Sequence, residues 1–234
     1  DAATLAWTQG VGGGSAWSPR QHHAAVCFDD GVIVTTGGSP GGSEVHTTTA
    51  GGTALLSVSQ TTFTARKGHA IARVPGDADA FLVVGGVGVN SSANNAALYL
   101  NDAILSEDRG GSFVVKSTGV FTSERAFTAL VATGPATFVL YGGGVPGSSK
   151  YNEVLQSTNS GVDWTTLRAE GGGGGECSGD AAMWSVRYGI AYAFMLLRNR
   201  ILVAGGYGSS PDYKQDVWGS DDGGTCWFLL TADS

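Results

Sequence analysis

Four arginines and four acids recur at matching places along the chain, and they are the residues with the clearest capacity for chemistry. Each arginine opens an apolar segment, and the four are Arg20, Arg66, Arg125 and Arg187. Each acid opens a later apolar segment, and the four are Glu44, Asp102, Glu153 and Asp216. A guanidinium group can hold the carboxylate of a ligand or form a bidentate ion pair with an acid of the protein. Because a group repeated in every unit more naturally serves the framework than a single ligand, we predict partly buried ion pairs between the repeated arginines and acids.

Hydrolytic chemistry would need a different arrangement of carboxyl groups. A glycoside hydrolase places two carboxyls on either side of one sugar bond. Glu124, Glu176 and Asp180 precede apolar segments and could face an opening, but nothing in the sequence pairs them. A convergent acidic pair in a central pocket would therefore indicate an enzyme, whereas aromatic residues on loops without such a pair would indicate binding. The sequence favours the non-catalytic interpretation and predicts no catalytic residues.

The histidines and cysteines predict neither a metal site nor a cofactor. His23 and His69 both follow a repeated arginine by three residues, so a strand position accounts for them. The cysteines lack the spacing of metal ligands; they are Cys27, Cys177 and Cys226. A disulfide between Cys177 and Cys226 is geometrically feasible because the ends of one repeat unit lie close together. It would leave Cys27 as a buried free thiol on the first strand of its unit.

The composition excludes several classes of protein. Thirteen basic and 20 acidic residues give a net charge of −7, so no basic surface is available for a nucleic-acid backbone. The longest apolar stretch, residues 188–204, contains Arg198 and Arg200, which opposes membrane insertion. Glycine supplies 38 of the 234 residues, more than twice its average share of about 7%. So much glycine among short apolar runs predicts an all-β fold of short strands and tight turns.

A fourfold internal repeat must position the residues named above. Paired glycines follow a short apolar strand four times, and the pairs end at Gly38, Gly86, Gly143 and Gly206. Behind each pair, a further segment begins with the repeated acid and continues with a hydroxyl, an acid or amide, a glycine and a large apolar residue at fixed spacing. We call the three complete examples box turns, and their key residues are Ser106, Asp108, Gly110 and Phe113; Ser157, Asn159, Gly161 and Trp164; and Ser220, Asp222, Gly224 and Trp227. Side-chain oxygens at this spacing can accept backbone N–H groups of a hairpin while glycine supplies positive φ, so the box turns are predicted to be structural.

Each repeat unit is therefore predicted to hold four antiparallel strands, the content of one propeller blade. The units are residues 18–58, 64–116, 122–168 and 184–231, called units 1 to 4, within a single domain spanning 1–234. Residues 4–8 are similar to the last strands of units 3 and 4, and are predicted to be a strand of a preceding blade. Two alternatives remain open: a four-bladed ring with an extra strand, or a portion of a larger ring.

The pattern resembles two known families of repeats. A strand ending in double glycine, followed by an N-D-V-like triplet and a later aromatic residue, is similar to the kelch motif of β-propellers. The segment from Ser220 to Trp227 matches S-x-D-x-G-x-x-W, the Asp-box of sialidases and related propellers. The resemblance spans nearly the whole chain and implies a β-propeller of four-stranded blades, six or seven of which usually complete a kelch ring. The R-I-P motif that supplies one of the three carboxylate-binding arginines of sialidases is absent.

Propellers of this kind bind proteins or glycans through the loops on one face. The sequence therefore predicts a non-catalytic interaction or structural module with a protein or glycan partner, and its open terminal blades would allow self-assembly or docking into a larger complex. The alternative is a sialidase-like glycoside hydrolase or a lectin. The Asp-boxes, the low charge and a glycosylation sequon at Asn90 favour an extracellular or cell-surface location, with a cytoplasmic one left open.

Overall fold

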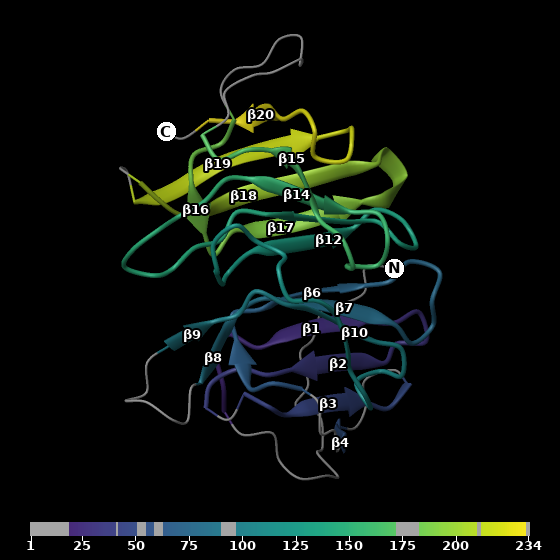
Figure 1. The fold of residues 1–234 in the computed structure, drawn as a ribbon. Coiled ribbons are helices and arrows are strands. Elements are labelled where there is room, and N and C mark those ends of the chain that lie inside the picture. Colours follow the sequence, from purple (N-terminus) through teal and green to yellow (C-terminus); the bar gives the residue numbers. More distant parts are fainter. Residues whose placement is uncertain are drawn as a thin grey trace, which may run out of the picture.

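The protein is an all-β fold of small four-stranded antiparallel sheets, which are the blades of a β-propeller (Figure 1). The structure is a computed structural model that describes residues 19–40, 42–50, 55–58, 63–89, 97–171, 183–209 and 212–232. The predicted strand at residues 4–8 and the sequon residue Asn90 lie outside the described residues. No helix in the described ranges has the length and apolar character needed to span a membrane.

Each repeat unit corresponds to one sheet whose strands follow one another from the centre outwards. The strands of units 1 and 2 are β1 (Ala24–Cys27), β2 (Ile33–Thr36), β3 (Val45–Thr48) and β4 (Leu55–Val58), then β6 (Ala70–Arg73), β7 (Phe81–Val84), β10 (Ala103–Ser106) and β11 (Val114–Ser117). The strands of units 3 and 4 are β12 (Ala129–Ala132), β13 (Phe138–Tyr141), β14 (Val154–Ser157) and β15 (Thr165–Arg168), then β17 (Ala191–Met195), β18 (Arg200–Gly208), β19 (Tyr213–Ser220) and β20 (Phe228–Thr231). A short 3₁₀ turn, η2 (Leu196–Arg198), joins β17 to β18. The first strands β1, β6, β12 and β17 lie at the centre of Figure 1, with β4 and β20 at opposite edges.

Four additional short strands were not expected from the sequence. β5 (Arg66–Lys67), β8 (Val87–Val89) and β9 (Ala97–Tyr99) form a three-stranded sheet, and β16 (Arg187–Tyr188) pairs with β18. They arise because the chain stays extended beyond the double glycine and pairs with the segment that carries the repeated arginine. The first glycines of the four pairs have φ of +61° to +67° and the second +91° to +103°. These are left-handed conformations that favour glycine, which explains the glycine pairs.

Successive units are joined by three separate hydrophobic clusters, one at each interface. Side chains alternate along each strand, so one face of a sheet meets the preceding unit and the other face meets the next. The strands contribute Val34 and Val45 against Phe81 and Val83, then Leu82 and Val84 against Phe138 and Leu140, and then Val139 and Tyr141 against Ile201 and Val203. The second glycine of each of the first three pairs also donates its N–H to the carbonyl of the next unit's arginine, at 2.9–3.3 Å. The interfaces between blades are thus repeats of one arrangement.

Candidate functional site

Each repeated arginine lies beside the repeated acid of its own unit. The two Nη atoms of Arg66 donate to the two carboxylate oxygens of Asp102, both at 2.8 Å. Arg125 Nη2 lies 2.5 Å from Glu153 Oε1. The other two ion pairs are Arg20 with Glu44 and Arg187 with Asp216. All four arginine side chains are at most 3% exposed, whereas the exposure of the acids ranges from 8% for Glu153 to 45% for Glu44. The guanidinium groups are therefore interior, and the pair of Arg20 with Glu44 reaches the surface.

Several of the other guanidinium donors are bonded to the backbone. Arg66, Arg125 and Arg187 each donate from Nε to the carbonyl two residues earlier, at 3.0–3.1 Å. The Nη1 groups of Arg20, Arg66 and Arg187 donate to the carbonyl of the first glycine in the pair of the same unit. Burial raises the pKa of Asp216. Hydrogen bonds from Arg187 and Trp218 lower it, and the net result is a pKa below the usual value. The arginine side chains are therefore held within their own blades and do not converge on a ligand.

The box turns share one hydrogen-bond pattern. In each, the serine Oγ accepts the N–H of the box glycine and donates to the Asp or Asn two residues along, at 2.7–3.0 Å. The Oδ1 atom of that residue accepts the N–H of the residue before the aromatic, at 2.8–2.9 Å. The indole groups of Trp164 and Trp227 donate back to the carbonyl of their box glycine. Unit 1 has Thr48 at the position of the box serine, and Thr48 Oγ1 instead accepts the N–H of Ile33.

The box glycines also form contacts between blades. A Cβ added to Gly110 would lie 2.5 Å from Val45 Cγ1 in unit 1, and one added to Gly161 would lie 2.9 Å from Leu82 Cδ1 in unit 2. Gly224 meets Val139 and Val154 of unit 3 in the same way. Each box turn thus packs directly on the preceding unit, and this close packing explains why glycine recurs at this position of the repeat.

The cysteines are only partly as expected. Cys226 is disulfide-bonded, and its predicted partner Cys177 lies outside the described residues. Cys27 is free but exposed, which corrects the prediction of a buried thiol. The prediction failed because β1 belongs to the first unit and, within the described residues, its outward side chains have no preceding blade against which to pack.

The first strands of the four units and the turns beside them line two cavities, one near each end of these strands. Residues from all four units line both cavities, which measure about 530 Å³ and 290 Å³. The larger lies at the end that carries the box turns and includes Arg73, Val131 and Phe194. The smaller lies at the double-glycine end and includes His22, Phe127 and Tyr192. The box-turn end carries ion pairs between units, and the double-glycine end carries a series of aromatic rings.

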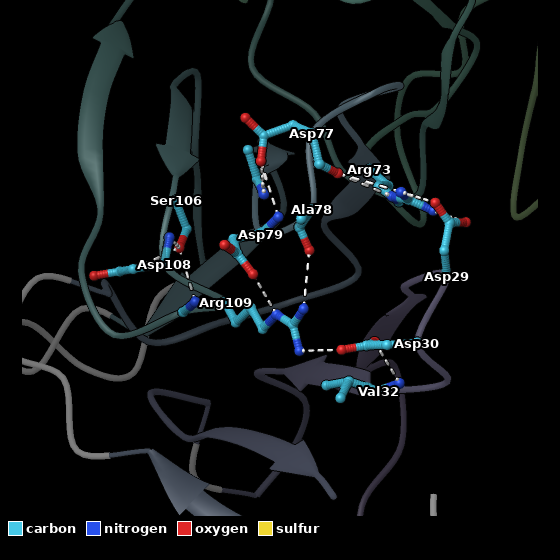
Figure 2. Close-up of polar contacts among 12 residues, drawn as sticks. Asp29, Asp30, Val32, Arg73, Asp77, Ala78, Asp79, Ser106, Asp108 and Arg109 are labelled. Carbon is cyan, nitrogen blue, oxygen red and sulfur yellow. Dashed lines mark hydrogen bonds and ion pairs between the residues drawn. The ribbon is translucent and has the colours of Figure 1, made fainter. Parts of the chain in front are cut away.

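At the box-turn end, two arginines of unit 2 bind the β1–β2 turn of unit 1 (Figure 2). Arg73 forms a bidentate pair with Asp29 at 2.5 and 2.6 Å. Arg109, which belongs to a box turn, bridges Asp30 at 2.8 Å and Asp79 at 2.6 Å. Both guanidiniums lie over the ring of Phe28, 5.4 and 5.1 Å from its centroid. The sequence did not predict these ion pairs because their residues do not recur in the other units.

At the double-glycine end, five rings from three units form a continuous chain of contacts, which we call the aromatic row. The centroid distances are 5.2 Å from His22 to Phe127, 6.0 Å from Phe127 to Tyr188, 5.3 Å from Tyr188 to Tyr207 and 5.5 Å from Tyr207 to Tyr213.

The outer part of the aromatic row is accessible and carries charged neighbours. Tyr213 is 80% exposed, and Tyr188 and Tyr207 are partly exposed. Lys150 Nζ lies 4.8 Å from the ring centroid of Tyr207. The negative charge of Asp212 raises the pKa of Tyr207. Sequence reasoning did not single out these tyrosines because they occupy non-equivalent positions in the repeat.

The described carboxyl groups can be compared with the pair that a glycosidase needs. The described carboxyl groups with shifted pKa values, Asp29, Asp30, Asp108, Asp216 and Asp221, all have them lowered. A general acid in this chemistry requires a raised pKa. Glu124 is exposed, whereas Glu176 and Asp180 lie outside the described residues. Within the described ranges, no group of three His, Cys, Asp or Glu residues could hold a metal ion.

Comparison with known proteins identifies no matching family model and no similar curated protein.

Proposed function

We propose that this protein is a non-catalytic propeller module that binds a protein or glycan ligand through the aromatic row. The observation that carries the proposal is the chain of exposed and partly exposed tyrosine rings at the double-glycine end. Tyrosine combines a large rigid apolar surface with a polar hydroxyl, which is why it is enriched at binding surfaces. Lys150 and Asp212 add opposite charges beside Tyr207, as expected where a ligand is oriented by a few polar contacts.

The same proposal assigns the repeated motifs to architecture. We infer that the double glycines and ion pairs are those of kelch-type blades and that the box turns are Asp-boxes. Their hydrogen bonds and packing contacts are made within and between blades. The loops are therefore left to provide the specificity of ligand binding. The disulfide at Cys226 supports a secreted or cell-surface location, because disulfides persist in oxidising compartments.

The test is a binding screen of the purified chain against an immobilised glycan array and a displayed random-peptide library. We expect ligands whose binding falls at least tenfold in Tyr207→Ala and Tyr213→Ala. Phe228→Ala is the matched control, since Phe228 is an exposed aromatic on the outer strand β20. Ligands that bind the two tyrosine variants as well as the wild type would contradict the proposal.

The alternative is a sialidase-like glycoside hydrolase, and it is tested with sialosides and aryl glycosides. We expect no turnover. Hydrolysis that is abolished by changing a single carboxylate would favour the enzyme over the binding module.

A further inference from the structure

The larger of the two cavities, at the box-turn end, has a mainly apolar wall built by three consecutive units. Units 2, 3 and 4 contribute Ala72, Pro75, Val131, Ala132, Phe194 and Leu196. Its volume of about 530 Å³ falls within the range of about 300–1,000 Å³ that is typical of ligand cavities, so one or two bulky side chains of a partner can enter it. An apolar pocket of this kind is where the anchor residue of a binding partner is buried.

Two leucines protrude beside this cavity. They belong to η2, the turn between β17 and β18, and Leu196 is also part of the cavity wall. Leu196 is 78% exposed and Leu197 101% exposed, the two highest values among the large aliphatic side chains of the described residues. Single exposed apolar residues are common on protein surfaces, but here they extend the apolar surface of a cavity outwards, which is typical of an interaction site.

The surface around the cavity and the two leucines is acidic. Nine acids and four bases lie in the described hairpin turns and strand ends of the box-turn end, an excess of five negative charges. Figure 2 shows the acids of units 1 and 2 around Arg73 and Arg109. The complete set is Asp29, Asp30, Asp77, Asp79, Glu107, Asp108, Asp163, Asp221 and Asp222 with Arg73, Arg109, Arg198 and Arg200.

The arginines of this end neutralise only part of the acidic set. Arg73, Arg109 and Arg200 form ion pairs with four of the acids. Among the described residues, the other five acids form no ion pair, and all five are exposed: Asp77, Glu107, Asp108, Asp163 and Asp222. A surface with an excess of one charge attracts a partner of the opposite charge.

We propose that the box-turn end binds a basic, amphipathic peptide segment of another protein. A bulky apolar side chain of the segment enters the cavity beside Phe194, a second packs on Leu197, and flanking lysines or arginines pair with the exposed acids of the box turns. A small molecule inside the cavity would reach neither Leu197 nor those acids, and an anionic lipid surface would be repelled by them. The site lies at the opposite end from the aromatic row, so its failure would leave the proposed binding function unaffected.

The test measures the binding of short fluorescein-labelled peptides by fluorescence anisotropy. Three peptides share a Leu-Trp-Leu centre and carry lysine, glutamine or glutamate on both sides, and a fourth keeps the lysines around a triglycine centre. We expect the first peptide to bind at least tenfold more tightly than each of the others, with an affinity that falls as salt is added, because salt screens exposed charges. No binding of the first peptide, or equally tight binding of any other, would overturn the proposal.

Two substitutions locate the site on the protein. Ala132→Phe fills the cavity and Leu197→Ser removes the protruding side chain, and each should weaken binding of the first peptide at least tenfold. Ala169→Phe and Leu229→Ser are the matched controls, since Ala169 is exposed directly after β15 and Leu229 is 44% exposed on β20. Because Leu197 is fully exposed, its replacement leaves the fold intact and keeps the test informative even if Ala132→Phe is unstable.

The acidic surface and the aromatic row are separated by further variants. Glu107→Gln combined with Asp163→Asn should weaken binding of the lysine-flanked peptide, whereas Glu124→Gln combined with Glu170→Gln, at two exposed acids of the double-glycine end, should not. Tyr213→Ala should bind this peptide as the wild type does. Full binding in Leu197→Ser, equal effects of the two double variants, or loss of binding in Tyr213→Ala would each contradict the proposed site.

Discussion

Replacing Arg125 by methionine should destabilise the protein more than almost any other single change to a charged residue. The side chain is 1% exposed and its ion-pair partner Glu153 8%. Its Nε donates to the Ser123 carbonyl at 3.0 Å, and its guanidinium carbon lies 3.7 Å from the ring centroid of Tyr151. Methionine fills much of the same volume but leaves the Glu153 carboxylate buried without its cation. Removing one partner of a buried pair costs about 3–5 kcal/mol.

The assay is urea and thermal unfolding of the wild type and Arg125→Met. For a chain of this size each kcal/mol corresponds to roughly 2–4 °C, so the melting temperature should fall by roughly 10 °C. Arg200→Met is the matched control, because Arg200 also binds a carboxylate in bidentate fashion, at 2.6 and 2.7 Å from Asp221, but on the surface. Exposed pairs contribute about 0–1 kcal/mol. Adding Glu153→Leu to Arg125→Met should recover most of the loss. An unchanged melting temperature in Arg125→Met, or equal losses in the two methionine variants, would refute the structural role of the repeated pairs.

Two further predictions concern pH and packing. Burial, reinforced by the charge of Arg66, lowers the pKa of His69 to about 3, so the unfolded chain binds a proton that the folded chain excludes between about pH 6.5 and 3. Stability should fall as pH falls through this window, by about 2 kcal/mol at pH 5; urea titrations at several pH values should show this slope reduced in His69→Gln, and an identical slope would contradict the assignment. Gly161→Ala combines a φ of +85° with a Cβ 2.9 Å from Leu82, whereas Gly147→Ala has a φ of +81° in open space. The second change should cost about 1–2 kcal/mol and the first about 1–3 kcal/mol more, and equal costs in chemical denaturation would argue against packing of the box turn on the preceding unit.

The repeat made the blades predictable from the sequence. Strand positions, the double glycines and the box turns are local patterns, and each requires only a short segment and its hydrogen bonds. The pairing of Arg66 with Asp102 was also within reach, because both residues recur at fixed places in every unit. The extra strand β8 was not, since it depends on the chain remaining extended after Gly86 and meeting the segment of Arg66.

The features that depend on the order of blades could not be predicted in the same way. Cys27 was expected to be a buried thiol on the first strand of its unit, but β1 is in the first unit and Cys27 is exposed. In the aromatic row, His22 and Phe127 both lie two residues after a repeated arginine, but that position holds glycine in units 2 and 4. Tyr207 follows the double glycine of unit 4, where no other unit has an aromatic residue, so the repeat did not predict their contacts. The ion pairs of Arg73 and Arg109 beside Phe28 likewise involve residues that do not recur in the other units.

The central claim is that this protein binds its ligand at the aromatic row and leaves it chemically unchanged. The most direct measurement incubates a ligand found in the binding screen with the wild type and with Tyr213→Ala, then records both the bound fraction and the mass of the recovered ligand. We predict that the ligand is recovered intact in both samples and that its bound fraction falls at least tenfold in Tyr213→Ala. A recovered ligand that has been cleaved, or binding that is equal in the two proteins, would contradict the account.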